Sequence, residues 1–228
     1  MNPMDLAREA AQSLTGQSPA RILAWTFEKL GDQVTIASSF GLEDIMLIDL
    51  ASRLTPKPDV FFLDTGVLFR ETYQTVDGIV KRYPIRLRAI YPDLTLDQQA
   101  EQFGEALWVR DPDACCHIRK VAPLNRALAG YQAWVTGVRR EQNPTRAHTE
   151  PVEWDAKHGL IKINPLVMLT QDQVWDYVKC HQVPYNPLHD QGFPSIGCIP
   201  CTRAVKPGED QRAGRWSGFD KKECGLHL

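Results

Sequence analysis

The chain has 228 residues, of which 43% are hydrophobic and 24% are charged, a composition typical of a globular protein. This length fits one large α/β domain or one domain with an appendage. The formal net charge of −2 gives no general attraction for nucleic acid, so an anion site would have to be built locally. The sequence shows neither a signal peptide nor an apolar run long enough to cross a bilayer. These features predict a cytoplasmic protein with no membrane or nucleic-acid role.

Hydrophobic periodicity predicts helices that alternate with short strands. The expected helices cover residues 5–30 with a break at 16–19, 45–54, 69–82, 95–107, 117–129 and 170–181. The expected strands cover residues 34–38, 59–64, 85–90, 133–138 and 161–163. This order is typical of an α/β fold with a mostly parallel sheet flanked by helices, in which ligands bind beyond the carboxyl ends of the strands. We expect a main domain over residues 1–205 and a mobile tail over residues 206–228.

Polar segments follow two of the expected strands. Ser38–Asp44 (SSFGLED) places hydroxyls and backbone N–H groups at a helix N-terminus, which suits a phosphate or a sulfate. The segment lacks the Gly-Lys-Ser/Thr ending of a Walker A loop, and a plain capping role for Ser38 or Ser39 is the alternative. Leu63–Gly66 (LDTG) could contact a ribose or an adenine, or form an ordinary strand-to-helix turn.

Arginines gather in two parts of the sequence. Arg139, Arg140 and Arg146 follow the expected strand at 133–138, and Arg212 and Arg215 lie in the expected tail. Guanidinium groups bind phosphate and sulfate in bidentate fashion, so these clusters indicate anion binding. Any single one of these arginines is better explained as a solvated surface charge.

The strongest local pattern is formed by four cysteines in two pairs. Cys115 and Cys116 are adjacent, and Cys198 and Cys201 form a C-x-x-C. Zinc and iron–sulfur clusters both accept four thiolates, and the adjacent doublet favours a cluster over zinc. The alternative is that a cysteine of the doublet packs as a small hydrophobic residue. Lys120, one helical turn beyond the doublet, would place a cation near the thiolates, or form a surface salt bridge.

Cys224 stands alone near the end of the chain, in the segment Lys221–His227 (KKECGLH). The two preceding lysines favour the thiolate, which is the reactive form of a cysteine. Glycines at positions 214, 218 and 225 give the segment freedom to move. These features indicate a nucleophile on a mobile tail, and an incidental cysteine in a disordered terminus is the alternative.

Taken together, these segments resemble the iron–sulfur branch of the assimilatory adenylyl-sulfate reductases, within the APS/PAPS reductase family. The resemblance runs in chain order from about residue 34 to the C-terminus. The matching segments are SSFGLED (38–44), LDTGxLFxET (63–72), CCHxxKxxPL (115–124), TGxRRxQ (136–142), GCxxCT (197–202), GExxRAGRW (208–216) and KECGLH (222–227). The cysteine pattern joined to the ECGLH ending is highly specific.

The resemblance implies a PP-loop nucleotide-binding α/β fold and a role for each matching residue. It implies a [4Fe-4S] cluster held by Cys115, Cys116, Cys198 and Cys201. It implies Cys224 as the catalytic nucleophile, with His227 as the histidine of the catalytic C-terminal motif. The substrate-binding residues that it implies are Ser38, Ser39, Leu63, Lys120, Arg139, Arg140, Arg212 and Arg215.

The reaction implied by the resemblance is reduction of adenosine 5′-phosphosulfate (APS) to sulfite and AMP through an enzyme S-sulfocysteine, in sulfate assimilation and cysteine biosynthesis. Thioredoxin, or a glutaredoxin, would be the electron donor, and a homo-oligomer is compatible with the sequence. One alternative is a reductase of 3′-phosphorylated APS (PAPS) or of both substrates. Another is an ATP-cleaving PP-loop enzyme, although the Gly-Gly loop typical of those enzymes is not seen at residues 38–41. A third is a zinc-stapled nucleotide-binding module.

Overall fold

The computed structural model describes residues 2–221 and 223–226, and the chain forms two compact units. Unit 1 consists of the chain up to Phe62, Asp77–Arg88 and Leu128–Tyr185. Unit 2 consists of Leu63–Val76, Ala89–Ala127 and the chain from Asn186 onward. The expected boundary at residue 205 does not separate these units, and the expected tail belongs to unit 2.

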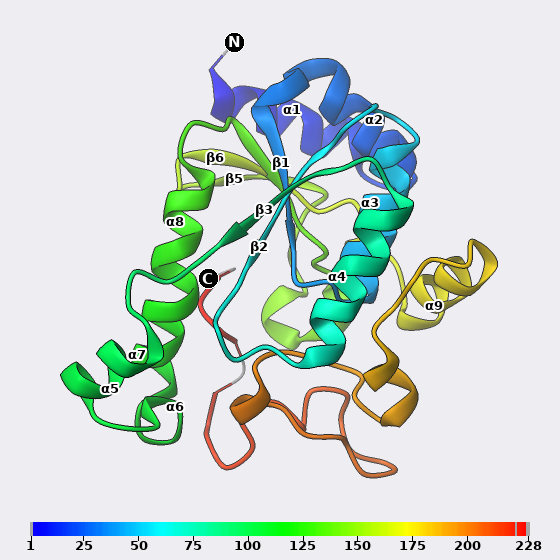
Figure 1. Cartoon of the computed structure of the whole chain (residues 1–228). Helices are drawn as coiled ribbons and strands as arrows, with labels where there is room; N and C mark the ends of the chain where they lie inside the picture. The colour runs from blue at the N-terminus through cyan, green and yellow to red at the C-terminus, as the bar shows by residue number, and fades with distance from the viewer. Residues whose placement is uncertain (1, 222, 227–228) are drawn as a thin grey trace. The chain divides into compact units, whose positions relative to one another are not determined.

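One six-stranded sheet runs through the described residues (Figure 1). Its strands, in spatial order, are β3 (Arg86–Ile90), β2 (Asp59–Leu63), β1 (Val34–Ser38), β4 (Ala133–Val135), β6 (Leu160–Ile163) and β5 (Val152–Asp155). β1 pairs in parallel with β2 and with β4, β4 pairs in parallel with β6, and β5 is antiparallel to β6. Strands β1, β4 and β6 are almost entirely buried, which explains why they appear in the sequence as short apolar runs.

Three helices of unit 1, α1, α2 and α9, begin behind residues whose side chains accept hydrogen bonds from their first backbone N–H groups. Asn2, Ser18 and Thr170 each accept a hydrogen bond from a backbone N–H of the following helix, and Thr170 forms a capping box with Gln173. α1 packs against β5 and β6, and α3 packs against β1, α2 and α9. The helical elements are α1 (Pro3–Leu14), α2 (Pro19–Leu30), η1 (Gly31–Gln33), α3 (Leu42–Ser52), η3 (Arg140–Gln142), η4 (Pro144–Arg146) and α9 (Gln171–Cys180), while α4 (Arg70–Arg82) spans both units.

A buried carboxylate on α3 holds three side chains of unit 1. Asp49 accepts hydrogen bonds from the hydroxyls of Tyr83 and Tyr177, and Nη2 of Arg53 lies 2.7 Å from its Oδ2. A buried carboxylate is stable only when it is hydrogen-bonded and paired with a cation, and these partners supply both. Asp49 thereby fixes α3, the helix whose N-terminus belongs to the candidate site.

Unit 2 is built mainly from short helical turns and loops. Two isolated bridges, Leu68 to Cys198 and Thr202 to Arg215, join its segments. A turn of π-helix follows directly after α7, and such turns occur frequently at functional sites. The helical elements are α5 (Leu96–Phe103), α6 (Leu107–Arg110), α7 (Pro112–Cys116), the π-helical η2 (His117–Val121), α8 (Ala122–Leu128), η5 (Pro187–Gln191) and η6 (Ile199–Cys201), with the last residue of α8 in unit 1.

The structure confirms the α/β fold, the five expected strands and the capping box before α9. The antiparallel strand β5, the short helices α6 and α7, and the π-helical turn were not predicted from the sequence. These elements are only four or five residues long, too short for a periodic pattern to be distinguished. Within residues 2–221 and 223–226, no helix is both long and apolar enough to cross a membrane.

Candidate active site

The loop between β1 and α3 carries Ser38 and Ser39. Ser38 Oγ accepts a hydrogen bond from the backbone N–H of Phe40 at 3.0 Å. Phe40 adopts a positive φ of 58° and is buried, with its ring 5.6 Å from the ring of Phe62 in an edge-to-face contact. This anchor turns the chain sharply, so α3 begins behind Gly41, which has no side chain to cap it. The N-terminus of α3 therefore has the dipole and the backbone donors that suit an anion.

The carboxylate of Asp44 lies against the same loop. The backbone N–H and the hydroxyl of Ser39 both donate to Oδ2 of Asp44, at 2.5 and 2.7 Å. Burial raises the pKa of Asp44 to about 6, although the bonds from Ser39 and the charge of Arg146 act in the opposite direction. An internal carboxylate thus occupies two donors of the segment Ser38–Gly41 between β1 and α3, which we call the anion loop. Asp44 was noted in the sequence only as the last residue of the SSFGLED motif.

Gly137, just after β4, packs against the first turn of α3. A Cβ atom at Gly137 would lie 2.4 Å from Oδ1 of Asp44 and 2.7 Å from Cβ of Glu43. Contacts this short do not occur for real side chains, so this position requires glycine. The segment after β4 is consequently held against the anion loop, as expected for two loops at the carboxyl ends of neighbouring parallel strands.

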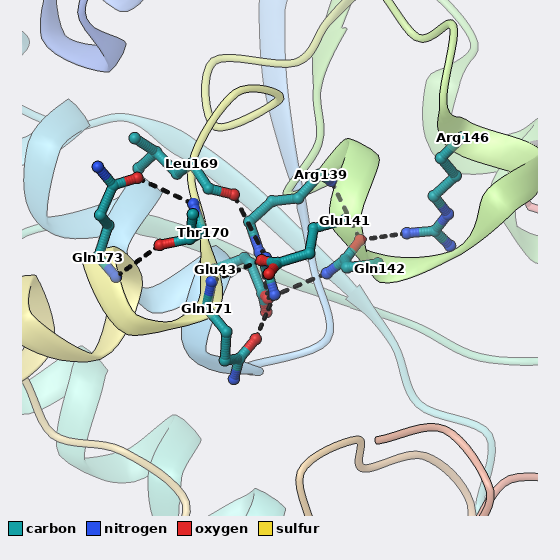
Figure 2. Close-up of polar contacts among 9 residues, drawn as sticks. All are labelled: Glu43, Arg139, Glu141, Gln142, Arg146, Leu169, Thr170, Gln171 and Gln173. Carbon is teal, nitrogen blue, oxygen red and sulfur yellow. Dashed lines mark hydrogen bonds and ion pairs between the residues drawn. The ribbon is translucent and has the colours of Figure 1, made fainter. Parts of the chain in front are cut away.

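Arg139 is only 1% exposed and lies at the centre of a polar network (Figure 2). Its Nε and Nη2 atoms both lie 2.9 Å from Oε1 of Glu43. Nη1 donates to Oε2 of Glu141 at 2.8 Å and to the backbone oxygen of Leu169 at 3.3 Å, and Nη2 also donates to Gln171. These contacts use every N–H group of the guanidinium. Arg139 therefore positions Glu43 on α3, and its contact with substrate stays a prediction.

The other two arginines of this stretch have different partners. Arg140 donates to the backbone oxygen of Thr149 at 2.8 Å and lies 3.5 Å from Glu150. Arg146 donates to Gln142, which also belongs to the network of Figure 2. The charge of Arg146 makes a small contribution that lowers the pKa of Asp44. The predicted substrate contact of Arg140 remains untested.

In unit 2, four cysteines line one pocket. Cys115 and Cys116 lie at the end of α7, whose first turn is capped by Asp111. Cys198 directly precedes η6, and Cys201 is its last residue. Cys198 Sγ lies 3.3 Å from the hydroxyl of Thr65. The residues that line the pocket are Val67, Trp108, Pro112, Cys115, Cys116, Arg119, Lys120, Cys198, Pro200 and Cys201. The structure thus brings together the four cysteines that the sequence paired.

The thiols of this pocket influence one another electrostatically. Burial, followed by repulsion from other cysteines, raises the pKa of Cys115 and of Cys201 to about 11. Burial also raises the pKa of Cys116, although the charge of Lys120 opposes the shift. Thiolates that share one pocket repel one another, so buried ones such as Cys115 and Cys116 need a compensating cation. A metal centre would provide that compensation, because metal ligation deprotonates thiols.

The donor set of this pocket fits an iron–sulfur cluster. Among residues 2–221 and 223–226, no three His, Cys, Asp or Glu side chains converge closely enough to hold a single metal ion. A [4Fe-4S] cluster binds its thiolates at separate irons, so its ligands surround a volume instead of meeting at a point. Four free cysteines around one pocket have this arrangement.

Two cations lie beside the cysteines, on the π-helical turn. Arg119 is buried and donates to the backbone oxygen of Thr65 at 2.6 Å and to Oε1 of Gln99 at 3.0 Å. Burial of Lys120 would lower its pKa, but cysteine thiolates, among them Cys198 and Cys224, outweigh this effect, so the pKa of Lys120 is raised. Lys120 was predicted to lie near the thiolates and does so, whereas Arg119 was missed.

The segment after β2 is held by a carboxylate. Asp64, directly after the predicted substrate residue Leu63, accepts hydrogen bonds from the backbone N–H of Gly66 at 3.0 Å and from the hydroxyl of Tyr73 at 2.7 Å. Burial and the bond to Asp64 raise the pKa of Tyr73. This geometry makes Leu63–Gly66 an ordered turn in unit 2. The nucleoside contact predicted for Leu63 stays a prediction.

Cys224 lies near enough to Cys116 and Lys120 for its negative charge to raise the pKa of both. Gly225 adopts a positive φ of 82°, and a Cβ atom there would lie 3.5 Å from Val121 on the π-helical turn. Packing of this glycine on η2 therefore helps to hold Cys224 beside the cysteine pocket. His227, the other residue predicted to be catalytic, lies outside the described residues.

Several contacts hold the chain that leads to Cys224. Arg215 stacks on Trp216 with its guanidinium carbon 4.6 Å from the ring centroid, and it donates to Ser195 Oγ at 3.2 Å. Lys221 contacts Asp113 on α7, and its Nζ lies 5.4 Å from the ring centroid of Trp216. Trp216 is thus a cation–π partner of two basic residues. Arg215 was predicted from the sequence as a site residue, whereas Trp216 and Asp113 were not.

The predicted site residues therefore divide between the units. Ser38, Ser39, Arg139 and Arg140 belong to unit 1. Leu63, Lys120, Arg212, Arg215, Cys224 and the four paired cysteines belong to unit 2. The residues that sequence reasoning missed are mostly carboxylates that hold the predicted ones, and their only signal was proximity in the motifs, as for Asp44 in SSFGLED and Glu223 in KECGLH.

A comparison with known protein families shows which family the chain belongs to. A family model, the phosphoadenosine phosphosulfate reductase domain, matches residues 33–204. The chain belongs to this family. The match spans β1, the anion loop and all four paired cysteines, and it confirms the resemblance seen in the sequence.

Several proteins named adenosine 5′-phosphosulfate reductase are closely similar in sequence to the chain. The adenosine 5′-phosphosulfate reductase of Staphylococcus haemolyticus is 49% identical over 208 residues, which cover 91% of this chain and 86% of that protein. The adenosine 5′-phosphosulfate reductase of Halalkalibacterium halodurans is 47% identical over 220 residues, which cover 96% of this chain and 95% of that protein.

Solved structures place the chain in the same fold as other nucleotide-binding enzymes. Phosphoadenylyl-sulfate reductase from Candida auris, in a phosphate complex, aligns with a TM-score of 0.74 at 28% identity, over 87% of this chain and 96% of that chain. The FMN adenylyltransferase of Candida glabrata in complex with ATP aligns with a TM-score of 0.58 at 17% identity, over 91% of this chain and 68% of that chain. The second likeness concerns the fold alone.

Proposed function

We propose that this protein reduces adenosine 5′-phosphosulfate to sulfite and AMP, as a step of sulfate assimilation that leads to cysteine. The proposal is carried by relatives named adenosine 5′-phosphosulfate reductase that are 47–51% identical over 90–96% of the chain. The placement of Cys224 beside Lys120 supports it, because a nucleophilic thiolate needs a neighbouring cation.

The chemical step assigned to Cys224 is nucleophilic attack. Its thiolate attacks the sulfur of the substrate, a bond forms between Sγ and that sulfur, and the bond from sulfur to the phosphate oxygen breaks. AMP leaves with the electron pair of the broken bond, and the enzyme carries an S-sulfocysteine. A donor thiolate then attacks Sγ of Cys224 and expels sulfite, which leaves a mixed disulfide between the donor and the enzyme. A second donor thiol resolves this disulfide, so the donor dithiol supplies two electrons.

Binding of the substrate requires compensation of two adjacent anions. We assign the N-terminus of α3, with Ser38 and Ser39, to one of these anions, because its backbone donors and dipole favour negative charge. Lys120, Arg212 and Arg215 supply positive charge in unit 2. Such preorganised groups stabilise the charge that develops on the leaving phosphate.

A [4Fe-4S] cluster is part of the proposal. Cys115, Cys116, Cys198 and Cys201 would hold it. When bound, it would supply a charged inorganic centre that tunes the field around Lys120. The two thiols of the donor already supply the electrons, so this role is electrostatic. Lys120 itself orients the sulfonate and places a positive charge beside Cys224.

A thioredoxin or a glutaredoxin is the donor in this proposal, because regeneration of Cys224 needs a dithiol. A cytoplasmic location belongs to the same proposal, since free catalytic thiols and a dithiol donor function in a reducing compartment. Self-association would be compatible with each of these steps.

The deciding experiment measures sulfite release by anaerobically purified protein with thioredoxin, and compares APS with PAPS at equal low concentration. We expect a strong preference for APS. Equal or greater use of PAPS would preserve the chemistry but change the substrate, in line with the name of the Candida auris structure. Release of sulfite from neither substrate, together with release of pyrophosphate from ATP, would replace the proposal with an ATP-cleaving enzyme of the same fold.

A further inference from the structure

Glu223, the residue before Cys224, is paired with a predicted substrate-binding arginine. Its Oε2 lies 3.7 Å from Nη2 of Arg212, and the two side chains are 5% and 20% exposed. A buried carboxylate needs a compensating cation, and Arg212 supplies one. The guanidinium of Arg212 is also expected to bind an anion of the substrate. Two anions therefore compete for Arg212, one inside the chain and one on the substrate.

We propose that Glu223 is an internal substitute for the substrate anion. It occupies Arg212 while no substrate is bound, and an anion that binds Arg212 displaces it. Because Glu223 and Cys224 are adjacent in the chain, this exchange also repositions the thiol. The inference rests on the proposed function, which supplies the substrate anion and the role of Cys224.

Arg212 is the fixed partner of this pair. Its backbone N–H donates to Oδ1 of Asp210 at 2.8 Å, and its backbone oxygen accepts from the N–H of Arg215 at 2.8 Å. Arg215 in turn forms a bridge with Thr202, next to the C-x-x-C segment. The turn that carries Arg212 is thus fastened to the rest of unit 2, so displacement moves Glu223 and not Arg212.

The exchange stays local because the chain is anchored just before Glu223. Lys221 contacts Asp113 on α7, with 8% of the lysine side chain exposed, and it also lies over the ring of Trp216. Behind Cys224, Gly225 has a positive φ that permits a change of direction at little cost. Displacement of Glu223 therefore acts on Cys224 without detaching the segment from α7.

The chemistry of the two anions favours exchange. The separation of 3.7 Å is longer than a charge-assisted hydrogen bond between a guanidinium and a carboxylate. A phosphate or a sulfonate presents three acceptor oxygens and can accept two parallel hydrogen bonds from one guanidinium. A substrate anion can therefore form a stronger pair with Arg212 than Glu223 does.

The test measures alkylation of Cys224 by iodoacetamide in the anaerobically purified full chain, followed by mass spectrometry of the Cys224 peptide. Inorganic sulfate is titrated as the probe, with chloride used to hold ionic strength constant. In the unaltered protein, we expect sulfate to change the alkylation rate about threefold or more, the size of effect expected from loss of one partly buried ion pair. A rate that sulfate leaves unchanged would overturn the inference.

Variants separate the exchange from a general effect of sulfate. In Glu223→Gln, the alkylation rate of Cys224 should no longer respond to sulfate, and the same is expected of Arg212→Gln. The double variant should have the same alkylation rate as either single variant. Glu223→Asp, which keeps the charge, should restore part of the response. The matched control is Glu209→Gln, which removes the same charge from the ion pair of Glu209 with Arg203 and should respond as the unaltered protein does.

A response of Glu223→Gln equal to that of the unaltered protein would overturn the inference. The steady-state kinetics give a second readout, because loss of an internal competitor should lower KM for APS about threefold or more while kcat falls. Failure of the proposed function would appear differently, as absence of sulfite from the unaltered protein. The alkylation assay gives its answer in either case, because it requires only sulfate and the thiol.

Discussion

The two compact units hold their candidate residues by different means. In unit 1, Ser38 and Ser39 follow a buried parallel strand, and backbone pairing of β1 with β2 and β4 fixes where the loop begins. In unit 2, the cysteines lie on short turns that are joined by isolated bridges and side-chain contacts. Backbone pairing in the sheet therefore positions the anion loop. The cysteine pocket is positioned by side-chain contacts and by any group that its four thiols bind.

The two units also share one arrangement of charges. In unit 1, the carboxylate of Asp44 accepts from the backbone and hydroxyl of Ser39. In unit 2, the carboxylate of Glu223 lies beside Arg212. In both cases an internal acidic group contacts donors that the sequence assigns to a substrate anion. The comparison predicts that chemistry and cofactor retention depend on unit 2, while pH-dependent stability depends on unit 1.

The largest expected effect concerns Cys224. Cys224→Ser should lower sulfite release by at least about 10³-fold, because a serine hydroxyl is a far weaker nucleophile than a thiolate and gives no adduct that a donor thiol can reduce. The measurement is sulfite formed from APS with thioredoxin. Cys180→Ser, at an exposed cysteine of α9 in unit 1, is the matched control and should keep full activity. Unchanged activity of Cys224→Ser would refute the assigned nucleophile.

The second-largest effect is expected from removing one cysteine of the pocket, which tests whether the pocket holds a bound cluster. Cys198→Ala should lower cluster affinity by at least about 10- to 100-fold, so the purified variant should contain little iron or labile sulfide. Iron and sulfide analysis of anaerobically purified protein checks this result. Cys180→Ala should retain both. One zinc and no iron in the unaltered protein would instead support a zinc-stapled module.

A pH effect of intermediate size should arise in unit 1 from Asp44. Its folded pKa of about 6 exceeds the ordinary value of 3.8, so the folded protein holds the proton more tightly than the unfolded chain. Asp44 therefore contributes about 3 kcal/mol to the free energy of unfolding below about pH 4, and this contribution is lost as the pH rises through 6. Asp44→Asn should lack this component.

The measurement for Asp44 is the free energy of unfolding between pH 4 and 7, taken as the difference between Asp44→Asn and the unaltered protein. That difference should rise with pH in favour of the variant. Asp172→Asn, at an exposed acidic residue in the first turn of α9, should follow the unaltered protein. A difference that does not vary with pH would mean that Asp44 is ionised throughout this range.

The smallest expected effect concerns the glycine that packs against the anion loop. Gly137→Ala places a Cβ atom 2.4 Å from Asp44 Oδ1, which should cost about 1–3 kcal/mol of stability and raise KM for APS more than it lowers kcat. Gly78→Ala in α4 is the control, because its Cβ would meet Pro184 at an ordinary 3.4 Å. Equal stability of the two variants would show that the loop can shift away from α3.

Much of the sheet could be predicted because its strands are short apolar runs between helical patterns. The antiparallel strand β5 could not, because only Val152 of its residues is fully buried and no apolar run marks it. The capping box at Thr170 was predicted because its two side chains, Thr170 and Gln173, lie only three residues apart in the sequence. Short-range sequence patterns thus predicted helices, strands and caps, and the family resemblance indicated that motifs far apart in the chain act together.

The candidate site was predicted less evenly. The four paired cysteines carry an unusual chemistry, so their spacing indicated a shared site that the structure forms around one pocket. Arg139 was predicted as a substrate contact because guanidinium groups bind anions, but it is buried in a network with Glu43 and Glu141. Such a network depends on residues far apart in the chain, and a single sequence holds no signal for that pairing.

The position of Trp216 makes the C-terminal segment visible to spectroscopy. Its indole is 3% exposed and lies against two cations, Arg215 and Lys221, on the stretch of chain that leads to Cys224. Any rearrangement that withdraws this indole from its surroundings will shift its emission to longer wavelengths and expose it to soluble quenchers. The protein therefore carries its own optical reporter, and stopped-flow fluorescence can time movements of the segment during turnover without an attached dye.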